Sequence, residues 1–132
     1  MSHATGSLSI SVSGTDAAAD VYLENLAGEK ITITSLEIMP STAVSTHAAN
    51  YITTAVTAGG VTLVTAHTTN SSGGSAMVAG TAIPFAFATT GVGTALEIAA
   101  GGTLRVQVAK AGTGPAYNFA VNAKYSVLGR GF

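Results

Sequence analysis

The three histidines and six carboxylates are the residues of this chain that could hold a metal ion or move a proton. A zinc site needs three or four ligands that lie close together in space. His3, His47 and His67 are widely separated, and neither an HxH nor an HExxH pattern occurs. We predict one histidine in an N-terminal arm, one in a Ser/Thr-rich loop and one near the end of a strand, and no metal site.

Two carboxylates that face each other across a sheet could serve as the acid and the base of a glycosidase. Glu24 and Glu37 both fall on predicted strands, where a solvent-facing position explains them better. Asp16 and Asp20 could contribute to a calcium site, but the EF-hand pattern is absent, and capping or turn formation accounts for them more simply. The carboxylates therefore predict neither a catalytic pair nor a cation site.

The sequence also lacks a cysteine nucleophile and the known motifs of a serine nucleophile or a phosphate-binding loop. The chain has no cysteine, which excludes a disulfide framework, a thiolate nucleophile and a Cys-based zinc site. The segment 74–80 begins and ends with glycine and precedes Thr81, but it lacks the Walker lysine, and no GxSxG elbow occurs. We predict that the protein is not an enzyme and that it binds no cofactor.

Composition and charge narrow the class of partner. Only 8% of the 132 residues are charged, whereas an ordinary soluble domain has about 25%. The Lys and Arg residues number five and are scattered, so the sequence predicts no binding to nucleic acid. Ala, Thr, Ser and Gly make up about half of the chain, far above the average domain. Such small side chains favour flat, closely apposed surfaces, as in a protein that works among identical or related subunits.

The uncharged stretch 38–96 contains no Asp, Glu, Lys or Arg. A membrane span needs about 20 mainly apolar residues in a row, and prolines, asparagines and glycine pairs interrupt this stretch, so we predict no membrane partner. Residues 1–7 lack the apolar core of a signal peptide, which predicts synthesis in the cytoplasm. Because interface cores are depleted of charge, we expect much of the subunit contact in the uncharged stretch.

Apolar and polar residues alternate with period two along much of the chain, which is typical of half-buried β-strands. The alternation is clearest where Leu8, Ile10 and Val12 are separated by serines, and along residues 117–127. Further strands are predicted at 21–23, 31–38, 50–57, 61–69, 83–87, 96–98 and 104–108. No segment has convincing helical periodicity.

Turn chemistry adds three local predictions. The alternation slips in phase after Thr34, so a β-bulge is predicted near Ser35. The glycine pairs at 59–60 and 101–102 predict two hairpins between the strands that flank them. Pro84 cannot donate a ladder hydrogen bond, which places its strand at the edge of a sheet.

These patterns predict an all-β protein, a two-sheet antiparallel β-sandwich of eight or nine strands and more specifically a jelly roll. The sandwich domain should span 8–127, between a flexible N-terminal arm (1–7) and a C-terminal tail (128–132). Leu128, Arg130 and Phe132 in the tail are candidates for partner contact, because Arg and aromatic residues are enriched at interface hot spots. A frayed chain end is the alternative explanation of the tail.

Four segments carry a resemblance to a known class of proteins. They are GTDAAADVYL (14–23), the loop 40–51 with its THAANY (46–51), TNSSGG (69–74) and LEIAAGGTL (96–104). Together they resemble the capsid decoration, or cement, proteins of tailed bacteriophages, and the resemblance covers most of the chain. It consists of strand and turn patterns, so no individual functional residue is carried over.

The resemblance implies a β-sandwich or jelly-roll module that lies on the outer capsid surface of the virion. Such proteins are often homotrimers, hold major capsid protein subunits together and reach over neighbours with a terminal arm. The implied partners are therefore the major capsid protein and further copies of the chain itself. A phage tail, neck or fibre component, and a receptor- or glycan-binding β-sandwich, remain as alternatives.

Overall fold

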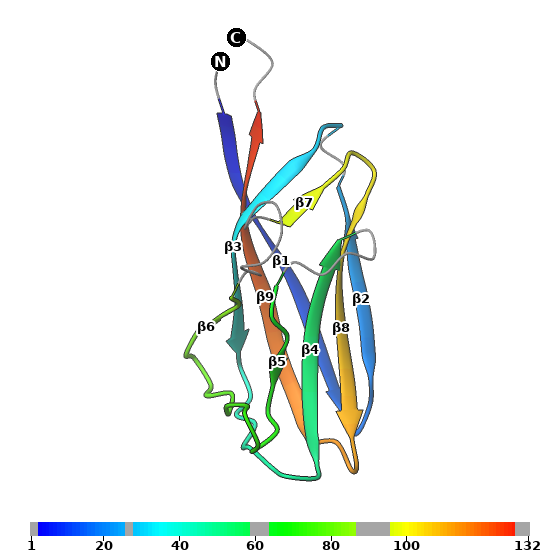
Figure 1. Cartoon of the computed structure of the whole chain (residues 1–132), viewed down its shortest axis with the longest axis vertical. Helices are drawn as coiled ribbons and strands as arrows, with labels where there is room; N and C mark the ends of the chain where they lie inside the picture. The colour runs from blue at the N-terminus through cyan, green and yellow to red at the C-terminus, as the bar shows by residue number, and fades with distance from the viewer. Residues whose placement is uncertain (1–2, 26–27, 59–63, 87–95, 129–132) are drawn as a thin grey trace.

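The computed structural model describes residues 3–25, 28–58, 64–86 and 96–128. These residues form two antiparallel β-sheets that pack face to face, with no helix among them (Figure 1). The predicted all-β, two-sheet antiparallel architecture is therefore confirmed. The described residues accordingly include no helix long and apolar enough to cross a membrane.

Sheet A has the strand order β1-β9-β3-β6, and β7 also pairs with β3. Its strands are β1 (His3–Thr15), β9 (Ala116–Leu128), β3 (Ile31–Pro40), β6 (Ile83–Pro84) and β7 (Leu96–Ile98). Sheet B has the order β2-β8-β4-β5. Its strands are β2 (Ala19–Glu24), β8 (Thr103–Ala111), β4 (Tyr51–Ala58) and β5 (His67–Thr68).

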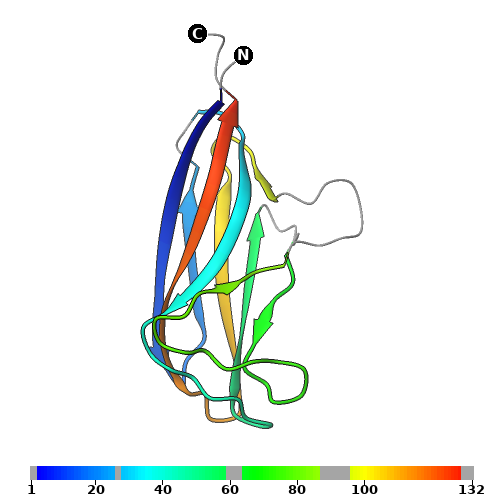
Figure 2. The same ribbon diagram turned by 90° about the vertical axis from the view of Figure 1, so that its left-hand side faces the viewer.

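The strands pair in a nested pattern. The first strand pairs with the last, β2 pairs with β8, β3 pairs with both β6 and β7, and β4 pairs with β5. Most consecutive strands therefore lie in different sheets, and the chain crosses repeatedly from one layer to the other, as the second view shows (Figure 2).

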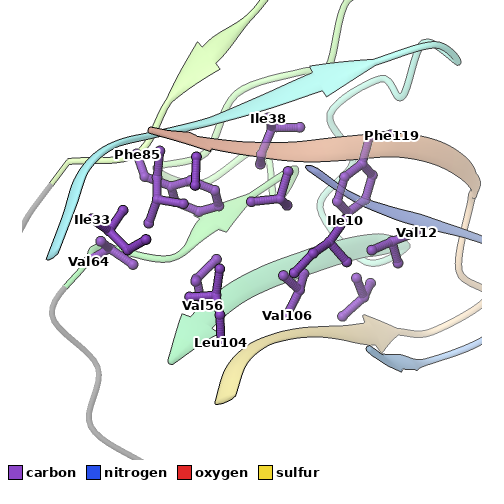
Figure 3. Close-up of a cluster of buried hydrophobic side chains, with 14 of the residues drawn as sticks. Ile10, Val12, Ile33, Ile38, Val56, Val64, Phe85, Leu104, Val106 and Phe119 are labelled. Atoms are coloured by element: carbon purple, nitrogen blue, oxygen red, sulfur yellow. The ribbon is translucent and has the colours of Figure 1, made fainter. Parts of the chain in front are cut away.

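The core lies between the sheets and is built by the alternation that the sequence displays. Ile33, Ile38 and Phe119 project from sheet A toward Val56 and Val106 of sheet B (Figure 3). Each such side chain contributes roughly 1.5–3 kcal/mol when it is fully buried. The predicted inward face of β9 is confirmed for its central part, because Tyr117, Phe119, Val121 and Ala123 are all buried.

The predicted bulge is confirmed. The register between β3 and β9 shifts between Ile33 and Ser35. The shift brings both Ile33 and Leu36 into the core although they are an odd number of positions apart, which a regular strand cannot do.

The edge position of Pro84 is confirmed as well. It belongs to β6, the last strand in the order of sheet A. The next residue, Phe85, donates its backbone N–H to the carbonyl of Leu36 at 2.9 Å. Phe87, which was predicted to extend this strand, lies outside the described residues.

The hairpin predicted around the glycine pair at 101–102 is wrong. β7 pairs with β3 in sheet A, whereas β8 pairs with β2 and β4 in sheet B. Ile98 and Leu104 are both buried, so they reach the shared core from opposite layers. The turn at Gly101, with φ of 75°, therefore carries the chain between sheets instead of closing a hairpin.

The strand predicted at 61–69 is shorter than expected. Residues 59–63 lie outside the described part, and of the remainder His67 and Thr68 form β5. These two residues pair antiparallel with Thr54 and Thr53 of β4.

Candidate interaction surfaces

The outer face of sheet A is lined with hydroxyl and amide groups. Every second residue of β1 from Thr5 to Thr15 is an exposed serine or threonine. Ser9 lies opposite Asn122 of β9 and donates its hydroxyl to Asn122 Oδ1 at 2.8 Å. A shallow hollow on this face is lined by Ser7, Leu8, Ser9, Ser35, Glu37, Asn122, Ala123 and Lys124. This arrangement can donate and accept hydrogen bonds over a broad, nearly neutral surface.

Where β4 and β8 pair, the outer face of sheet B carries small, uncharged side chains. Thr53 and Ala55 of β4 lie opposite Ala109 and Gln107 of β8. A second shallow hollow is lined by these four residues together with Ala18, Ala19, Asp20 and Val108. Because these four side chains are short and neutral, another surface can approach this part of the face closely, beside the charged Asp20.

One narrow side of the sandwich leaves apolar surface in solvent. This side, formed by the edge strand β1 and residues 21–23 of β2, is called the β1–β2 side below. Tyr22 is 64% exposed and Leu23 is 40% exposed. Leu23 lies opposite the buried Leu104 and so faces the core, yet β2 is an edge strand and leaves it partly uncovered. Leu8 and Val21 are also only partly buried although they pack against the core.

Asp16 accepts hydrogen bonds from two residues of the same chain. Its Oδ1 accepts hydrogen bonds from Lys110 Nζ at 2.6 Å and from the Gly114 N–H at 2.8 Å, which ties the β1–β2 turn to the β8–β9 turn. Its φ of 49° is left-handed, a conformation that Asp tolerates. The hydrogen bond from Lys110, followed by that from Gly114, holds the pKa of Asp16 below its ordinary value. Asp16 thus occupies a turn, as the sequence predicted.

Asp20 and Arg105 form an ion pair on the outer face of sheet B. Arg105 Nε donates to Asp20 Oδ1 at 2.7 Å, and Arg105 Nη2 donates to the other carboxylate oxygen. The hydrogen bond from Arg105 lowers the pKa of Asp20. Glu97 pairs in a similar way with Lys30 at 3.2 Å. Asp20 lies within β2, so the turn or capping role predicted for it is wrong, and both Asp20 and Glu97 serve as ion-pair partners.

The two histidines whose side chains are described serve separate local roles. His47 Nδ1 accepts hydrogen bonds from the backbone N–H groups of Ala49 at 3.0 Å and Asn50 at 2.9 Å, which stabilises a turn. His67 Nε2 lies 3.1 Å from Ser75 Oγ, while its Nδ1 is buried without a hydrogen-bond partner. Burial lowers the pKa of His67, because the charged imidazolium is poorly solvated there. Within the described ranges, no group of three His, Cys, Asp or Glu residues could hold a metal ion.

The residues predicted for partner contact lie at the end of the chain. The backbone of Leu128 ends β9 and pairs with His3. Arg130 and Phe132 lie outside the described residues, so their role stays a prediction. Within the span assigned to the N-terminal arm, residues 3–7 pair with 124–128 of β9.

The uncharged stretch 38–96 supplies β4, β5 and β6 and the loops that join them. Val78, in one of these loops, is 55% exposed. The expectation that this stretch makes much of the subunit contact remains a prediction.

Asn25 is a structurally important residue that the sequence analysis did not single out. It is 7% exposed, and its Nδ2 donates to the carbonyls of Glu29 at 2.7 Å, Ile98 at 3.1 Å and Ala99 at 3.1 Å. Its backbone N–H donates to the Gly102 carbonyl at 2.7 Å. An Asn shortly before a glycine signals a turn, but its distant partners become visible only in the folded chain.

Comparison with known proteins did not reveal a family. No protein-family model matches the chain, and no curated protein matches it significantly.

Proposed function

We propose that this protein is a structural component of a tailed-bacteriophage virion that binds the outer capsid surface and stabilises contacts between major capsid protein subunits. The observation that carries the proposal is the low charge of both outer faces, where short Ser, Thr, Ala and Asn side chains predominate and the few charges are of both signs. Such faces can meet several partners with little desolvation of charge. On a lattice, many weak equivalent contacts add up to stable attachment.

We infer further that the sandwich is a jelly roll. The nested pairing supports this. A jelly roll is one long antiparallel ribbon that is wrapped into two layers. In this chain the paired β1 and β9 form one end of the ribbon, and the paired β4 and β5 form the other. β6 and β7 then count as one interrupted strand, since both pair with β3. Jelly rolls are frequent among viral capsid and lectin domains.

The resemblance to decoration proteins is the second support for the proposal. It implies the major capsid protein as partner, the outer surface of the virion as location and a homotrimer as the assembled form. A tail, neck or fibre position is the nearest alternative, because the same surface composition suits it equally.

A glycan-binding role is favoured by one specific feature, the polar hollow on sheet A. Its lining includes Ser9, Glu37, Asn122 and Lys124, whose groups can hydrogen bond to sugar hydroxyls. The exposed large aromatic residue of the described chain, Tyr22, lies on β2 in the other sheet. The hollow therefore offers polar groups without the aromatic platform that glycan sites commonly use, and we rank this function second.

The test is binding to capsids of the phage that carries the gene, prepared from a strain in which the gene is deleted. We expect saturable co-sedimentation of the purified chain and a higher temperature of capsid disruption, because a ligand of the intact form stabilises that form. Tails purified from the same phage, and immobilised glycans, serve as controls. Retention on tails or glycans without binding to capsids would contradict the proposal and favour the corresponding alternative.

A further inference from the structure

β1 presents a long, unprotected edge. It has 13 residues, pairs in unbroken register with β9 and contains no proline and no Asp, Glu, Lys or Arg. In the part of the chain that the structure describes, β9 is its sole partner strand. The other side of β1 therefore offers a row of unpaired backbone N–H and C=O groups, which is a template for a further strand. Proteins usually block such an edge with lysine, proline or a bulge, and β1 has none of these.

The chemistry of β1 is the same in both directions around Ile10. The sequence TGSLSISVSGT (5–15) places matching residues at equal distances from the centre. The matching pairs are Ser9 and Ser11, Leu8 and Val12, Ser7 and Ser13, Gly6 and Gly14, Thr5 and Thr15. A two-fold antiparallel pairing sets each residue opposite its match in the other copy, so this strand is complementary to itself.

We propose that two copies of this chain pair through their β1 edges, antiparallel and around a two-fold axis at Ile10, so that their A sheets join into one. The pairing sets Ser9 opposite Ser11 of the partner subunit, and hydroxyl pairs of this kind stabilise antiparallel strands. No like charges meet along the interface, because β1 carries none. The proposal concerns the free protein and does not depend on capsid binding.

The exposed apolar residues give a second, independent reason for a partner at this place. Leu23 is 40% exposed on the β1–β2 side, and Leu8 and Val21 are only partly covered there, whereas Tyr22 shares the outer face of sheet B with Arg105. Because β2 contacts β1, a second copy that pairs with β1 also approaches these side chains. Their removal from water adds a hydrophobic contribution to the strand pairing.

The first test is the mass of the purified full chain in solution, measured by light scattering over a range of concentrations. A two-fold pairing closes at two copies, so we expect twice 13.0 kDa. The resemblance to decoration proteins implies three copies instead. A monomer at every concentration, or a three-copy mass, would overturn the β1 pairing while leaving capsid binding to be judged by its own experiment.

Charge variants test the register. In Ser9→Lys/Ser11→Lys, like charges face each other twice across the axis, and we expect the dimer dissociation constant to rise roughly tenfold or more. The matched variant Ser9→Lys/Ser11→Glu sets opposite charges face to face with the same number of substitutions, so the dimer should persist. Equal dissociation of both variants, or of neither, would overturn the register centred on Ile10.

Hydrogen exchange on the unsubstituted chain provides a measurement that does not depend on the folding of any variant. We expect amides of β1 to exchange more slowly at concentrations where the dimer forms. Equal exchange at low and high concentration would exclude the pairing. If the charge variants instead lose capsid binding from a monomeric protein, the edge pairs with a capsid strand and the self-pairing is wrong.

Discussion

Two glycines of β1 are required by the rings of their cross-strand partners. Gly6 lies opposite Tyr125, and Gly14 lies opposite Tyr117. A Cβ at Gly14 would lie 2.7 Å from the Tyr117 hydroxyl oxygen. Tyr117 cannot easily move away, because it is buried and its hydroxyl donates to the Ala17 carbonyl at 2.7 Å.

We therefore predict that Gly14→Ala lowers the free energy of unfolding by about 1–3 kcal/mol, the usual cost of overpacking. Gly6→Ala should cost less, because Tyr125 is only half-buried and its ring can shift. The measurement is denaturant unfolding, with the exposed neighbour Ser13→Ala as the control, expected within about 0.5 kcal/mol of the unsubstituted chain. If Gly14→Ala and Ser13→Ala behave alike, the ring of Tyr117 is not held in place.

At the scale of the elements, Asn25 holds together two connections at one end of the sandwich. One leads from β2 to β3, and the other leads from β7 to β8. Its side-chain bonds to the Ile98 and Ala99 carbonyls join these two connections. The same contacts explain why the glycine pair at 101–102 closes no hairpin. The chain is held near Asn25 as it passes from sheet A to sheet B, and Gly101 donates its N–H to the Asn25 carbonyl at 3.0 Å.

Replacing Asn25 should destabilise both connections together. We expect Asn25→Ala to lower the free energy of unfolding by about 1–3 kcal/mol, because the buried Ile98 carbonyl and two partly buried carbonyls lose a donor. Asn122→Ala is the matched control, since Asn122 lies on the outer face of sheet A and should stay within about 0.5 kcal/mol. A similar loss in both variants would show that the bonds of Asn25 contribute no more than those of an outer-face asparagine.

At the scale of the whole molecule, the pairing of β1 with β9 brings both chain ends to one end of the sandwich (Figures 1 and 2). His3 lies directly opposite Leu128. A partner that binds at this end can therefore contact the first residues of β1 and the last residues of β9 at once.

Deletion of residues 130–132 should weaken capsid binding by about tenfold or more, as expected when an Arg and an aromatic anchor are lost together. Occupancy on capsids measured by sedimentation is the readout. Deletion of residues 1–2, at the other terminus, is the control and should have little effect. Unchanged occupancy after the first deletion would remove the tail from the interface without contradicting capsid binding itself.

Much of the fold could be predicted because its signals are local. The inward face of β9, the bulge at Ser35 and the edge position of Pro84 each follow from the chemistry of a few neighbouring residues. The surfaces were predicted less completely. The sequence indicated a neutral contact region at 38–96, but it did not indicate the apolar exposure of Tyr22 and Leu23, which depends on which strands become edges.

By itself, the sequence determined which side chains turn toward a core, because period-two alternation and the burial of apolar groups act within each strand. Only the tertiary structure decided which strands pair. β7 joins β3 and not its neighbour β8, and Asn25 finds partners more than seventy residues away. The physical reason is that an antiparallel ladder can form between any two compatible strands, so the packing of both layers around one shared core selects the pairing. The folded chain engages Asp16, Asp20 and His47 in ion pairs and turn contacts. Among the described surfaces, we propose the two outer faces and the β1–β2 side for function.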